Sequence, residues 1–481
     1  MRKGTSLSVT DQFCGAGGSS QGAARALAPI GGHVKLAMNH WKLAIETHNH
    51  NFPDTMHDCT DISACDPRRY PSTNILLTSP ECTNHSLAKG QKIVKKQLEL
   101  FDKGIIDPAA ERSRATMWDV VRFAEYHQYE GIVVENVVDA RNWVLFDSWL
   151  TAMHNLGYLH KSVYINSKHF HPTPQSRDRM YIVFWKKGNP APDLEYRPKA
   201  YCKCCGKDVE AFQYWKNPNI RFGKYGKQYV YKCPVDGSTV EPYYYAAFNA
   251  IDWSDIGQRI GDRNKPLSAN TLRRIETGLK KYGNSPMILK AEHANSDNVR
   301  SAYHAFQTQT TRQSMGLVVP YIIEMNKTGK MKPAAEHATS TFTGGGINHA
   351  LFVSNYSPGY AKPLTDSLGT VTTSDHHALL TMEAMSAFVH YYNSNTTLSK
   401  IDEALGTITT KNRCTLVSYK QPLIEDCHYR MLKPHEVKAA MAFEPDYVVL
   451  GNARDQVRQL GNAVTPPAME WLVKQLAQTL L

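Results

Sequence analysis

Short apolar runs alternate with longer amphipathic segments over the first 187 residues of the chain. The apolar runs have the length of buried strands in a parallel sheet. They are residues 6–11, 74–78, 131–135 and 180–185. Residues 114–129 carry apolar side chains at helical spacing and predict a helix with one apolar face. Strands that alternate with helices predict an α/β fold with a doubly wound sheet.

The pattern changes after residue 187. A stretch rich in Pro, Gly and Cys opens a long region of short strand-like runs. Within it, a threonine-rich segment followed by an apolar run recurs, which predicts a repeated β-unit. The copies are residues 306–319, 339–353, 367–380 and 404–417. Their threonine-rich turns suit either contacts with phosphates and bases or plain connections between strands.

Helical patterning returns near residue 426 and ends in an amphipathic run at residues 468–481, which we expect to pack against the first domain. We therefore predict a first domain of residues 1–187, a mainly β insertion of residues 188–426, and a segment of residues 427–481 that completes the first domain. A chain of 481 residues is too long for one ordinary core, which agrees with more than one domain.

Charge and cysteine content indicate which kind of partner and which cellular compartment to expect. Lys and Arg (55) exceed Asp and Glu (44) by 11, which favours a polyanionic partner slightly over a plain solvated surface. No apolar run is long enough for a membrane helix and no signal peptide is recognisable, so we expect a cytoplasmic protein without a membrane partner. Ten Cys in a chain of this length indicate buried, metal-bound or catalytic thiols rather than a disulfide framework.

Two motifs follow the first two apolar runs. A glycine-rich turn from Asp11 to Gly22 lets the backbone approach a ligand at a helix N-terminus, although a plain strand-to-helix turn has the same residues. Cys82 lies just beyond the end of the next strand, at the sheet edge where α/β folds bind ligands. Taken alone, a cysteine at this place is more often a small buried hydrophobic residue than a nucleophile.

Three further motifs lie later in the chain. Glu135 ends the third apolar run and offers a carboxyl group to a site. Arg177 and Arg179 occupy alternate positions of an extended segment, so they project to the same side and suit an anion or a buried carboxylate. Residues 459–467 form a turn that leads into the last helix.

Taken in this order, the motifs resemble those of the cytosine-5 DNA methyltransferase family, whose members use S-adenosylmethionine (SAM). The resemblance covers residues 5–185 and 428–475, and residues 114–117 and 429–436 match two further family motifs. It implies a Rossmann-like SAM-methyltransferase sheet and makes residues 188–426 a second, mainly β target-recognition domain.

The resemblance implies a role for each catalytic residue. The thiolate of Cys82 would add to carbon 6 of cytosine and so make carbon 5 reactive toward the methyl group of SAM. Glu135 would hold the ring nitrogen and the exocyclic amine. Arg177 would steady Glu135 and the base near Cys82, with Arg179 in support. Because these atoms are inaccessible inside a duplex, the target base must be flipped out.

The resemblance also implies a cofactor site. Phe13 would stack on adenine, the backbone around Gly15 and Gly17 would line the methionine end, and Asp61 would accept a hydrogen bond from the adenine amine. Asn462 and Val464 would form part of the closing wall. The whole implied set is Asp11, Phe13, Gly15, Gly17, His40, Trp41, Asp61, Pro80, Asn462 and Val464.

The chain departs from the family pattern near the nucleophile and near the ribose. Glu81 and Thr83 flank Cys82 where the family has Pro and Gln. A carboxylate beside a thiol raises the thiol's pKa unless it points away, so thiolate formation would need Arg177 or a helix N-terminus. His40 stands where the family has an acidic residue that binds the ribose hydroxyls.

A separate cysteine motif lies in the insertion. The segments Cys202-Lys-Cys-Cys205-Gly and Cys233-Pro-Val-Asp236-Gly resemble the two knuckles of a zinc ribbon. Three thiolates and a carboxylate are an acceptable ligand set for a tetrahedral zinc ion, so we expect a structural zinc at Cys202, Cys205, Cys233 and Asp236. The alternatives are Cys204 or water in place of Asp236, and a degenerate knuckle without metal.

The sequence therefore predicts a monomeric cytosine-5 methyltransferase that acts on double-stranded DNA, because a large recognition region suits a specific duplex sequence. An RNA cytosine-5 methyltransferase and a catalytically inactive DNA-binding relative are the alternatives.

Overall fold

The computed structural model describes most of the chain, in twelve stretches. They are residues 6–80, 108–283, 285–291, 298–323, 331–333, 352–354, 360–362, 377–379, 386–392, 395–400, 414–418 and 423–481. The chain divides into two compact units. The first unit is Met1–Ile251 with His304–Ser314 and Leu432–Leu481, and the second is Asp252–Tyr303 with Met315–Met431. The predicted boundaries at residues 187 and 426 stay predictions, and residues 188–251 fall in the first unit.

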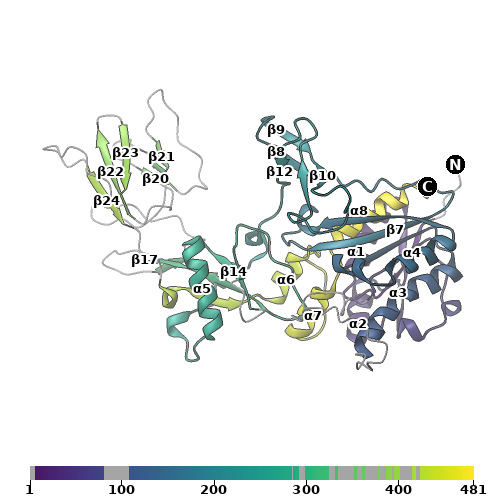
Figure 1. The fold of residues 1–481 in the computed structure, drawn as a ribbon. Coiled ribbons are helices and arrows are strands. Elements are labelled where there is room, and N and C mark those ends of the chain that lie inside the picture. Colours follow the sequence, from purple (N-terminus) through teal and green to yellow (C-terminus); the bar gives the residue numbers. More distant parts are fainter. Residues whose placement is uncertain are drawn as a thin grey trace, which may run out of the picture. The chain divides into compact units, whose positions relative to one another are not determined.

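A seven-stranded sheet, whose strand β7 is labelled in Figure 1, forms the centre of the first unit. Its strand order is β3-β2-β1-β4-β5-β7-β6. The strands are β1 (Ser8–Gln12), β2 (His33–Asn39), β3 (Met56–Cys59), β4 (Ile75–Thr78), β5 (Gly131–Asn136), β6 (Tyr158–Asn166) and β7 (Asp178–Lys186). Strands β1 to β5 pair in parallel, whereas β7 is antiparallel to both β5 and β6. The predicted α/β fold with a mainly parallel sheet is confirmed.

The prediction that residues 180–185 form a parallel strand is wrong. The connection from β6 to β7 spans residues 167–177 and holds no α-helix. A parallel neighbour needs a longer crossover, usually through a helix, so this short connection reverses the chain direction.

Helices cover both faces of the sheet because neighbouring strand residues are buried on opposite sides. Leu76 and Ile132 belong to a core shared with α3 and α4, whereas Leu77 and Val133 belong to a core shared with α1 and α8. The helices of this unit are α1 (Gly18–Leu27), α2 (Lys42–Asn51), α3 (Pro108–His127), α4 (Phe146–Asn155), α6 (Pro434–Ala440), α7 (Ala453–Asn462) and α8 (Pro466–Ala477). The C-terminal run thus supplies one wall of the core.

Helices α1 and α8 approach closely through glycine. A Cβ atom on Gly22 would lie 2.5 Å from the carbonyl oxygen of Pro466 and 2.8 Å from the backbone nitrogen of Glu470. A larger residue would therefore push the two helices apart.

Residues 199–240, here called the ribbon, form two small sheets in the first unit. The strands are β8 (Lys199–Cys202), β9 (Lys207–Glu210), β10 (Phe212–Trp215), β11 (Tyr229–Lys232) and β12 (Thr239–Val240). Strands β8 and β9 pair as a hairpin, and β11 lies between β10 and β12. Tyr229 and Tyr231 of β11 belong to the same core as α3 and α4, so the ribbon is packed into this unit.

The second unit contains the helix α5 (Ala269–Tyr282) and small antiparallel sheets. A five-stranded sheet has the order β13-β25-β16-β14-β15. Its strands are β13 (Gln258–Arg259), β14 (Met287–Lys290), β15 (Val299–Ser301), β16 (Met315–Val319) and β25 (His428–Met431). The predicted mainly β second part is confirmed.

The shorter strands of the second unit follow the repeats seen in the sequence. They are β17 (Tyr321–Ile323), β18 (Met331–Pro333), β19 (Phe352–Ser354), β20 (Tyr360–Lys362), β21 (His377–Leu379), β22 (Ser386–Tyr392), β23 (Asn395–Lys400) and β24 (Cys414–Ser418). The apolar ends of the four predicted copies coincide with β16, β19, β21 and β24. The threonine-rich turns at residues 367–376 and 404–413 lie outside the described residues.

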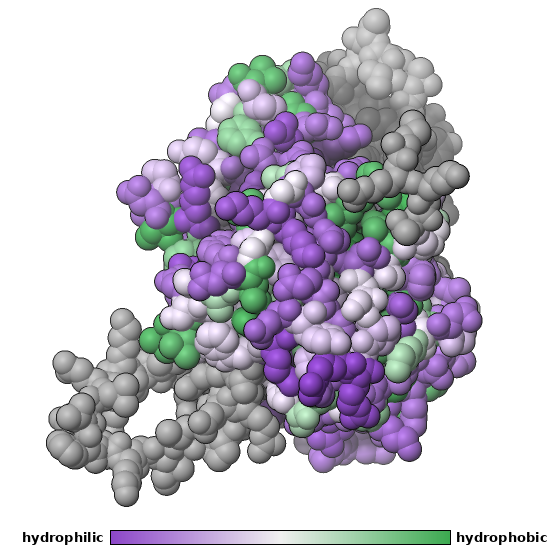
Figure 2. All heavy atoms as spheres, turned by 90° about the vertical axis from the view of Figure 1, so that its right-hand side faces the viewer, coloured by the Kyte–Doolittle hydropathy of each residue, from purple (hydrophilic) through white to green (hydrophobic). Residues whose placement is uncertain are grey.

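The surface carries few large apolar areas on the face drawn in Figure 2, where hydrophilic residues predominate and hydrophobic ones form small separate groups. Among the described residues, no helix combines the length and the hydropathy that a membrane crossing requires.

A chain of buried hydrogen bonds joins β1, α1, α2 and β3. Asp11 accepts from the hydroxyl of Ser20 at 2.6 Å, and Nε2 of His48 lies 2.8 Å from that hydroxyl oxygen. Because Ser20 has one proton to donate and gives it to Asp11, His48 donates from Nε2 and accepts at Nδ1 from His57, 2.8 Å away. His48 is therefore neutral in this arrangement. Burial, followed by the neighbouring His57, lowers the pKa of His48 to about 3.

His48 should make the protein acid-labile. Its folded pKa lies below its unfolded value, so its stabilising contribution is complete above about pH 6.5 and is lost as the pH falls toward 3. We expect His48→Gln to lower the slope of the free energy of unfolding against pH, between pH 4 and 6, by up to about 1.4 kcal/mol per pH unit. Urea unfolding at a series of pH values measures this slope. His50→Gln, an exposed position on the same helix, is the control, and an unchanged slope in His48→Gln would contradict the assignment.

Candidate active site

The carboxyl ends of β1 to β5 lie at one edge of the sheet because these strands are parallel. Each strand is followed there by residues that the sequence singled out. The glycine turn follows β1, His40 and Trp41 follow β2, and Asp61 follows β3 by one residue. Pro80 follows β4, and Glu135 lies within the last two residues of β5. The fold therefore gathers the predicted site at one edge.

The turn after β1 is held in a left-handed conformation. Phe13, Gly15 and Gly17 have φ values of 56°, 53° and 83°. A Cβ atom on Gly17 would lie 2.3 Å from the hydroxyl oxygen of Tyr447, which donates to the carbonyl of Ala16 at 2.5 Å. By contrast, a Cβ atom on Gly15 would meet only the carbonyl oxygen of Phe13, at 3.9 Å. The backbone at Gly15 is thus open to a ligand, whereas Gly17 is needed for packing.

The side chain of Asp11, the residue before the last of β1, holds the first turn of α1 through hydrogen bonds. Its Oδ2 accepts from the hydroxyls of Ser19 and Ser20, each at 2.6 Å. Complete burial raises the pKa of Asp11 to about 6, and the two serine hydrogen bonds oppose that rise. Its contacts therefore anchor the helix that begins at the glycine turn.

The remaining cofactor candidates differ in exposure. His40 and Asp61 are exposed, and Asp61 accepts from the backbone N–H of Ser63 at 3.1 Å. The ring of Trp41 is covered by the guanidinium of Arg458, whose central carbon lies 4.4 Å from the ring centroid. A tryptophan held in this way offers a fixed face beside the turn.

Val464 reaches the same turn from the C-terminal segment. A Cβ atom on Gly18 would lie 2.0 Å from the carbonyl oxygen of Val464, so the segment packs directly on the start of α1. Asn462 ends α7 and is exposed.

These residues fit SAM. The open backbone at Gly15 and the half-exposed ring of Phe13 offer surfaces for its polar and aromatic parts, and the exposed carboxylate of Asp61 can accept from an amine.

Glu135 forms an ion pair with Arg179 at this edge of the sheet. Oε1 of Glu135 lies 2.6 Å from Nε of Arg179, and the two side chains are only 11% and 15% exposed. Strand β7 brings them together because Glu135 of β5 pairs with Tyr181, two residues after Arg179. A guanidinium so close fixes the orientation of the carboxylate.

Arg177 contacts two segments that are distant in the sequence. Its guanidinium donates to the carbonyl oxygens of Gln309, at 3.3 Å, and Gly461, at 3.0 Å. It is 4% exposed. Arg177 therefore ties the start of β7 to the segments that carry residues 304–314 and Asn462.

The predicted nucleophile lies beyond the described residues. Pro80 is buried, and its carbonyl oxygen accepts from the side-chain nitrogen of Asn136 at 3.5 Å. Cys82 follows Pro80 by two positions and, with Glu81 and Thr83, lies outside the described residues.

Gln12 and Thr78 were missed by the sequence analysis. They end β1 and β4, where they pair in register, and both are buried. Within the described residues, the amide of Gln12 and the hydroxyl of Thr78 have no hydrogen-bond partner. Buried polar groups usually have one, so these two are candidates for contact with a ligand. Their position as the last residues of adjacent strands is the signal that could have identified them.

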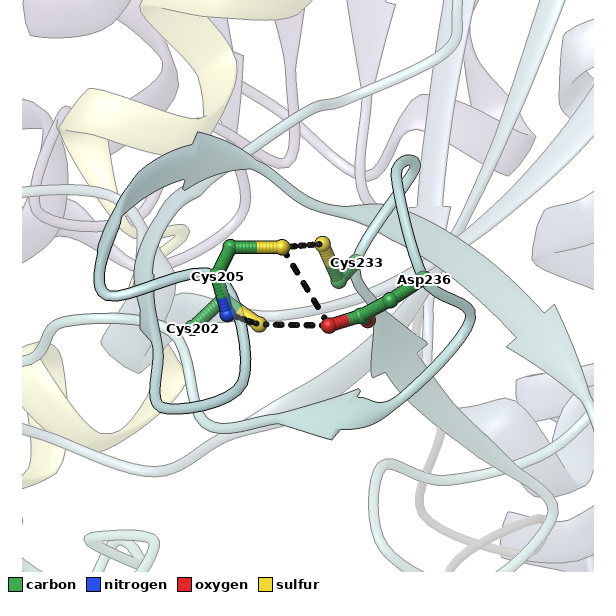
Figure 3. Close-up of side chains that lie close together, drawn as sticks. All are labelled: Cys202, Cys205, Cys233 and Asp236. Carbon is green, nitrogen blue, oxygen red and sulfur yellow. Dashed lines mark hydrogen bonds between the residues drawn. The ribbon is translucent and has the colours of Figure 1, made fainter.

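The four predicted metal ligands lie together in the ribbon (Figure 3). Their ligand atoms, Sγ of Cys202, Cys205 and Cys233 and a carboxylate oxygen of Asp236, are all within 4.8 Å of one another. Cys204 is exposed.

Three solved structures are similar to the chain at low identity. The Entamoeba histolytica methyltransferase EhMeth is 11% identical with a TM-score of 0.46, and 99% of each chain is covered. A Spodoptera frugiperda DNMT2 mutant is 12% identical with a TM-score of 0.47, covering 98% of this chain and 100% of that one. A putative DNA modification methyltransferase encoded within an E. coli prophage is 13% identical with a TM-score of 0.42, and 99% of each chain is covered.

No curated protein matches the chain significantly. The family model for C-5 cytosine-specific DNA methylase, in contrast, matches residues 7–478, which is nearly the whole chain. The resemblance found in the sequence is confirmed: the chain belongs to the C-5 cytosine-specific DNA methylase family.

Proposed function

We propose that this methyltransferase transfers a methyl group from SAM to carbon 5 of a flipped-out cytosine in a specific DNA sequence, through a covalent adduct with Cys82. The observation that carries the proposal is the buried ion pair of Glu135 with Arg179, at the same sheet edge as the open glycine turn. A fixed carboxylate beside a cofactor turn can hold the cytosine ring where a methyl donor reaches carbon 5.

The chain's residues divide the chemistry among them. The Cys82 thiolate adds to carbon 6, which makes carbon 5 nucleophilic. Glu135 holds the ring nitrogen and the exocyclic amine, and Arg179 holds Glu135 in place. Loss of the carbon 5 proton to solvent then restores the ring and expels Cys82.

SAM is the cofactor expected of this family, and when bound it supplies the electrophilic methyl group. Phe13, the backbone at Gly15, and Asp61 would hold it, with Trp41 and the Val464 loop alongside. We also propose, independently of the reaction, a structural zinc ion at the four-residue cluster of the ribbon; it takes no part in the chemistry.

Duplex DNA is the proposed substrate because the chain has a net charge of +11 and a large β-rich insertion. We further propose that residues 188–426 recognise the target sequence and that the enzyme acts as a cytoplasmic monomer.

Cys82→Ala should lower methyl transfer by about a thousandfold or more, because no other thiol would replace the nucleophile. DNA binding should remain. The wild type should also form an adduct with DNA that contains 5-fluorocytosine, stable in denaturing gels, because fluorine cannot leave carbon 5 as a proton does. Transfer of labelled methyl groups to mixed-sequence duplex DNA measures the first effect.

The exposed Cys204 provides a matched control, since Cys204→Ser should keep full activity. An active Cys82→Ala variant would overturn the mechanism. Methyl transfer to tRNA and not to duplex DNA would favour an RNA enzyme, and tight DNA binding by a wild type without methyl transfer would favour an inactive binding protein.

Arg177, which directly precedes β7, and Arg179 of β7 should differ in their effects. Arg179→Lys keeps a charge near Glu135 but loses the planar guanidinium, so we expect kcat to fall about tenfold with a small change in stability. Arg177→Lys removes donors from two buried backbone carbonyls, so we expect it to lower the free energy of unfolding by about 2 kcal/mol. Steady-state kinetics and urea unfolding measure both, and equal effects of the two substitutions would contradict this division.

A further inference from the structure

The two cysteine turns of the ribbon have the same backbone geometry. The N–H of Gly206 donates to the carbonyl of Cys202 at 2.9 Å, and the N–H of Gly237 donates to the carbonyl of Cys233 at 3.0 Å. Both glycines are left-handed, with φ of 66° and 72°. Asp236 therefore occupies in the second turn the place that Cys205 has in the first.

Backbone N–H groups also point at the leading sulfur of each turn. The N–H of Cys205 lies 3.5 Å from Sγ of Cys202, and the N–H of Val235 lies 3.4 Å from Sγ of Cys233. Such donors stabilise negative charge on sulfur, which a metal-bound thiolate carries.

The spacing of the ligand atoms suits a tetrahedral zinc ion. Sγ of Cys205 and Sγ of Cys233 are 3.8 Å apart. Two thiolates at a zinc–sulfur distance of about 2.3 Å are separated by about 3.8 Å in a tetrahedron. Oδ2 of Asp236 lies 3.2 Å from Sγ of Cys202 and from Sγ of Cys205. The soft sulfur ligands favour zinc over magnesium or calcium.

Ser238 orients the carboxylate. Its backbone N–H and its hydroxyl both donate to Oδ1 of Asp236, at 2.9 and 2.6 Å, which leaves Oδ2 facing the sulfurs (Figure 3). A partner that fixes the free oxygen of a ligating carboxylate is typical of metal sites.

Strand β11 connects this cluster to the catalytic loops. It ends one residue before Cys233, and its Tyr229 and Tyr231 are buried. The ring of Tyr231 contacts His169 edge-on, with centroids 5.1 Å apart, and the ring of Tyr229 contacts Tyr225, with centroids 5.7 Å apart. Because tightly packed buried side chains cannot shift independently, a displacement of one end of β11 would also displace the other end.

The turn before β11 contacts the chain near both residues of the ion pair, Glu135 and Arg179. Nζ of Lys224 lies 3.0 Å from Oδ2 of Asp139, four residues after Glu135. The backbone N–H of Tyr225 donates to Oδ1 of Asp178, next to Arg179, at 2.9 Å. One turn of the ribbon thus contacts β7 at Asp178 and the segment that follows β5 at Asp139.

We infer that the zinc-held ribbon is a positioning element, which keeps Glu135 and Arg179 in register through the contacts of Lys224 and Tyr225. Lys224 and Tyr225 are positioning residues, since they act through Asp139 and Asp178. The effect on turnover rests on the proposed function, whereas the metal and the order of the loops do not.

Metal content tests the first step. The protein should carry one zinc per chain by mass spectrometry of the native protein, and Cys205→Ser and Cys233→Ser should each lose it. Cys204→Ser should keep it, as should Asp236→Cys, which completes four thiolates. Ser238→Ala should weaken zinc binding by about tenfold, because the carboxylate loses its orienting partner. Wild-type protein without zinc after growth in zinc-supplemented medium, or a Cys205→Ser variant with full zinc content, would overturn the site.

Hydrogen exchange tests the positioning step without relying on activity or on folding of a cysteine variant. Removing zinc from the wild type with a chelator should speed amide exchange in residues 134–142 and 176–182, and added zinc should reverse the change. If removal of zinc leaves amide exchange unchanged in both segments, the positioning role is refuted, even when the metal analysis shows that the wild type binds zinc.

Lys224 variants link the ribbon to turnover. Lys224→Met should lower kcat by about two- to fivefold, as expected for loss of one partly exposed ion pair, with KM for SAM and zinc content unchanged. Lys224→Arg should restore kcat. An unchanged kcat in Lys224→Met would refute the link between the ribbon and turnover. Absence of methyl transfer by the wild type would instead refute the proposed function, and the zinc and hydrogen-exchange results would not be affected by it.

Discussion

The burial of both faces of one sheet is the constraint on which the first unit depends. Strands such as β5 place alternate residues on opposite faces, so each face needs its own helices. The chain supplies α1 and α8 to the same face, although they are far apart in sequence. Gly18 and Gly22 allow this contact because a side chain at either position would strike backbone atoms of the C-terminal segment. The requirement to cover the sheet thus brings Val464 against the glycine turn that follows β1.

The same sheet lowers the cost of burying charge at its edge. Glu135 and Arg179 are almost fully covered, and isolated ionised groups in that position would be strongly unfavourable. Pairing at 2.6 Å satisfies both, and the antiparallel pairing of β7 with β5 sets the geometry. The fold itself thus holds both charged groups in one fixed geometry.

The sequence was sufficient for the fold class and the family, but not for the pairing of charges. The apolar run of β7 has the same composition in a parallel or an antiparallel strand, so its direction depended on the short connection after β6. Arg177 and Arg179 are only two residues apart, and only the tertiary structure shows that Arg179 reaches Glu135 while Arg177 reaches Gly461. Local spacing did suffice for the cysteine cluster, because each turn carries its own ligands.

The path of the chain explains why Arg177 is buried among carbonyls. The chain leaves the first unit after Ile251, returns for His304–Ser314, and returns finally at Leu432. On the middle passage Phe306 pairs with Gln175, donating to Pro174 at 2.7 Å and accepting from Ser176 at 2.8 Å. Arg177 follows directly and donates to Gln309 of that passage. The segment that enters and leaves the second unit is therefore fixed two residues from Arg179, so the connection to that unit and the ion pair of Glu135 with Arg179 share one short stretch of backbone.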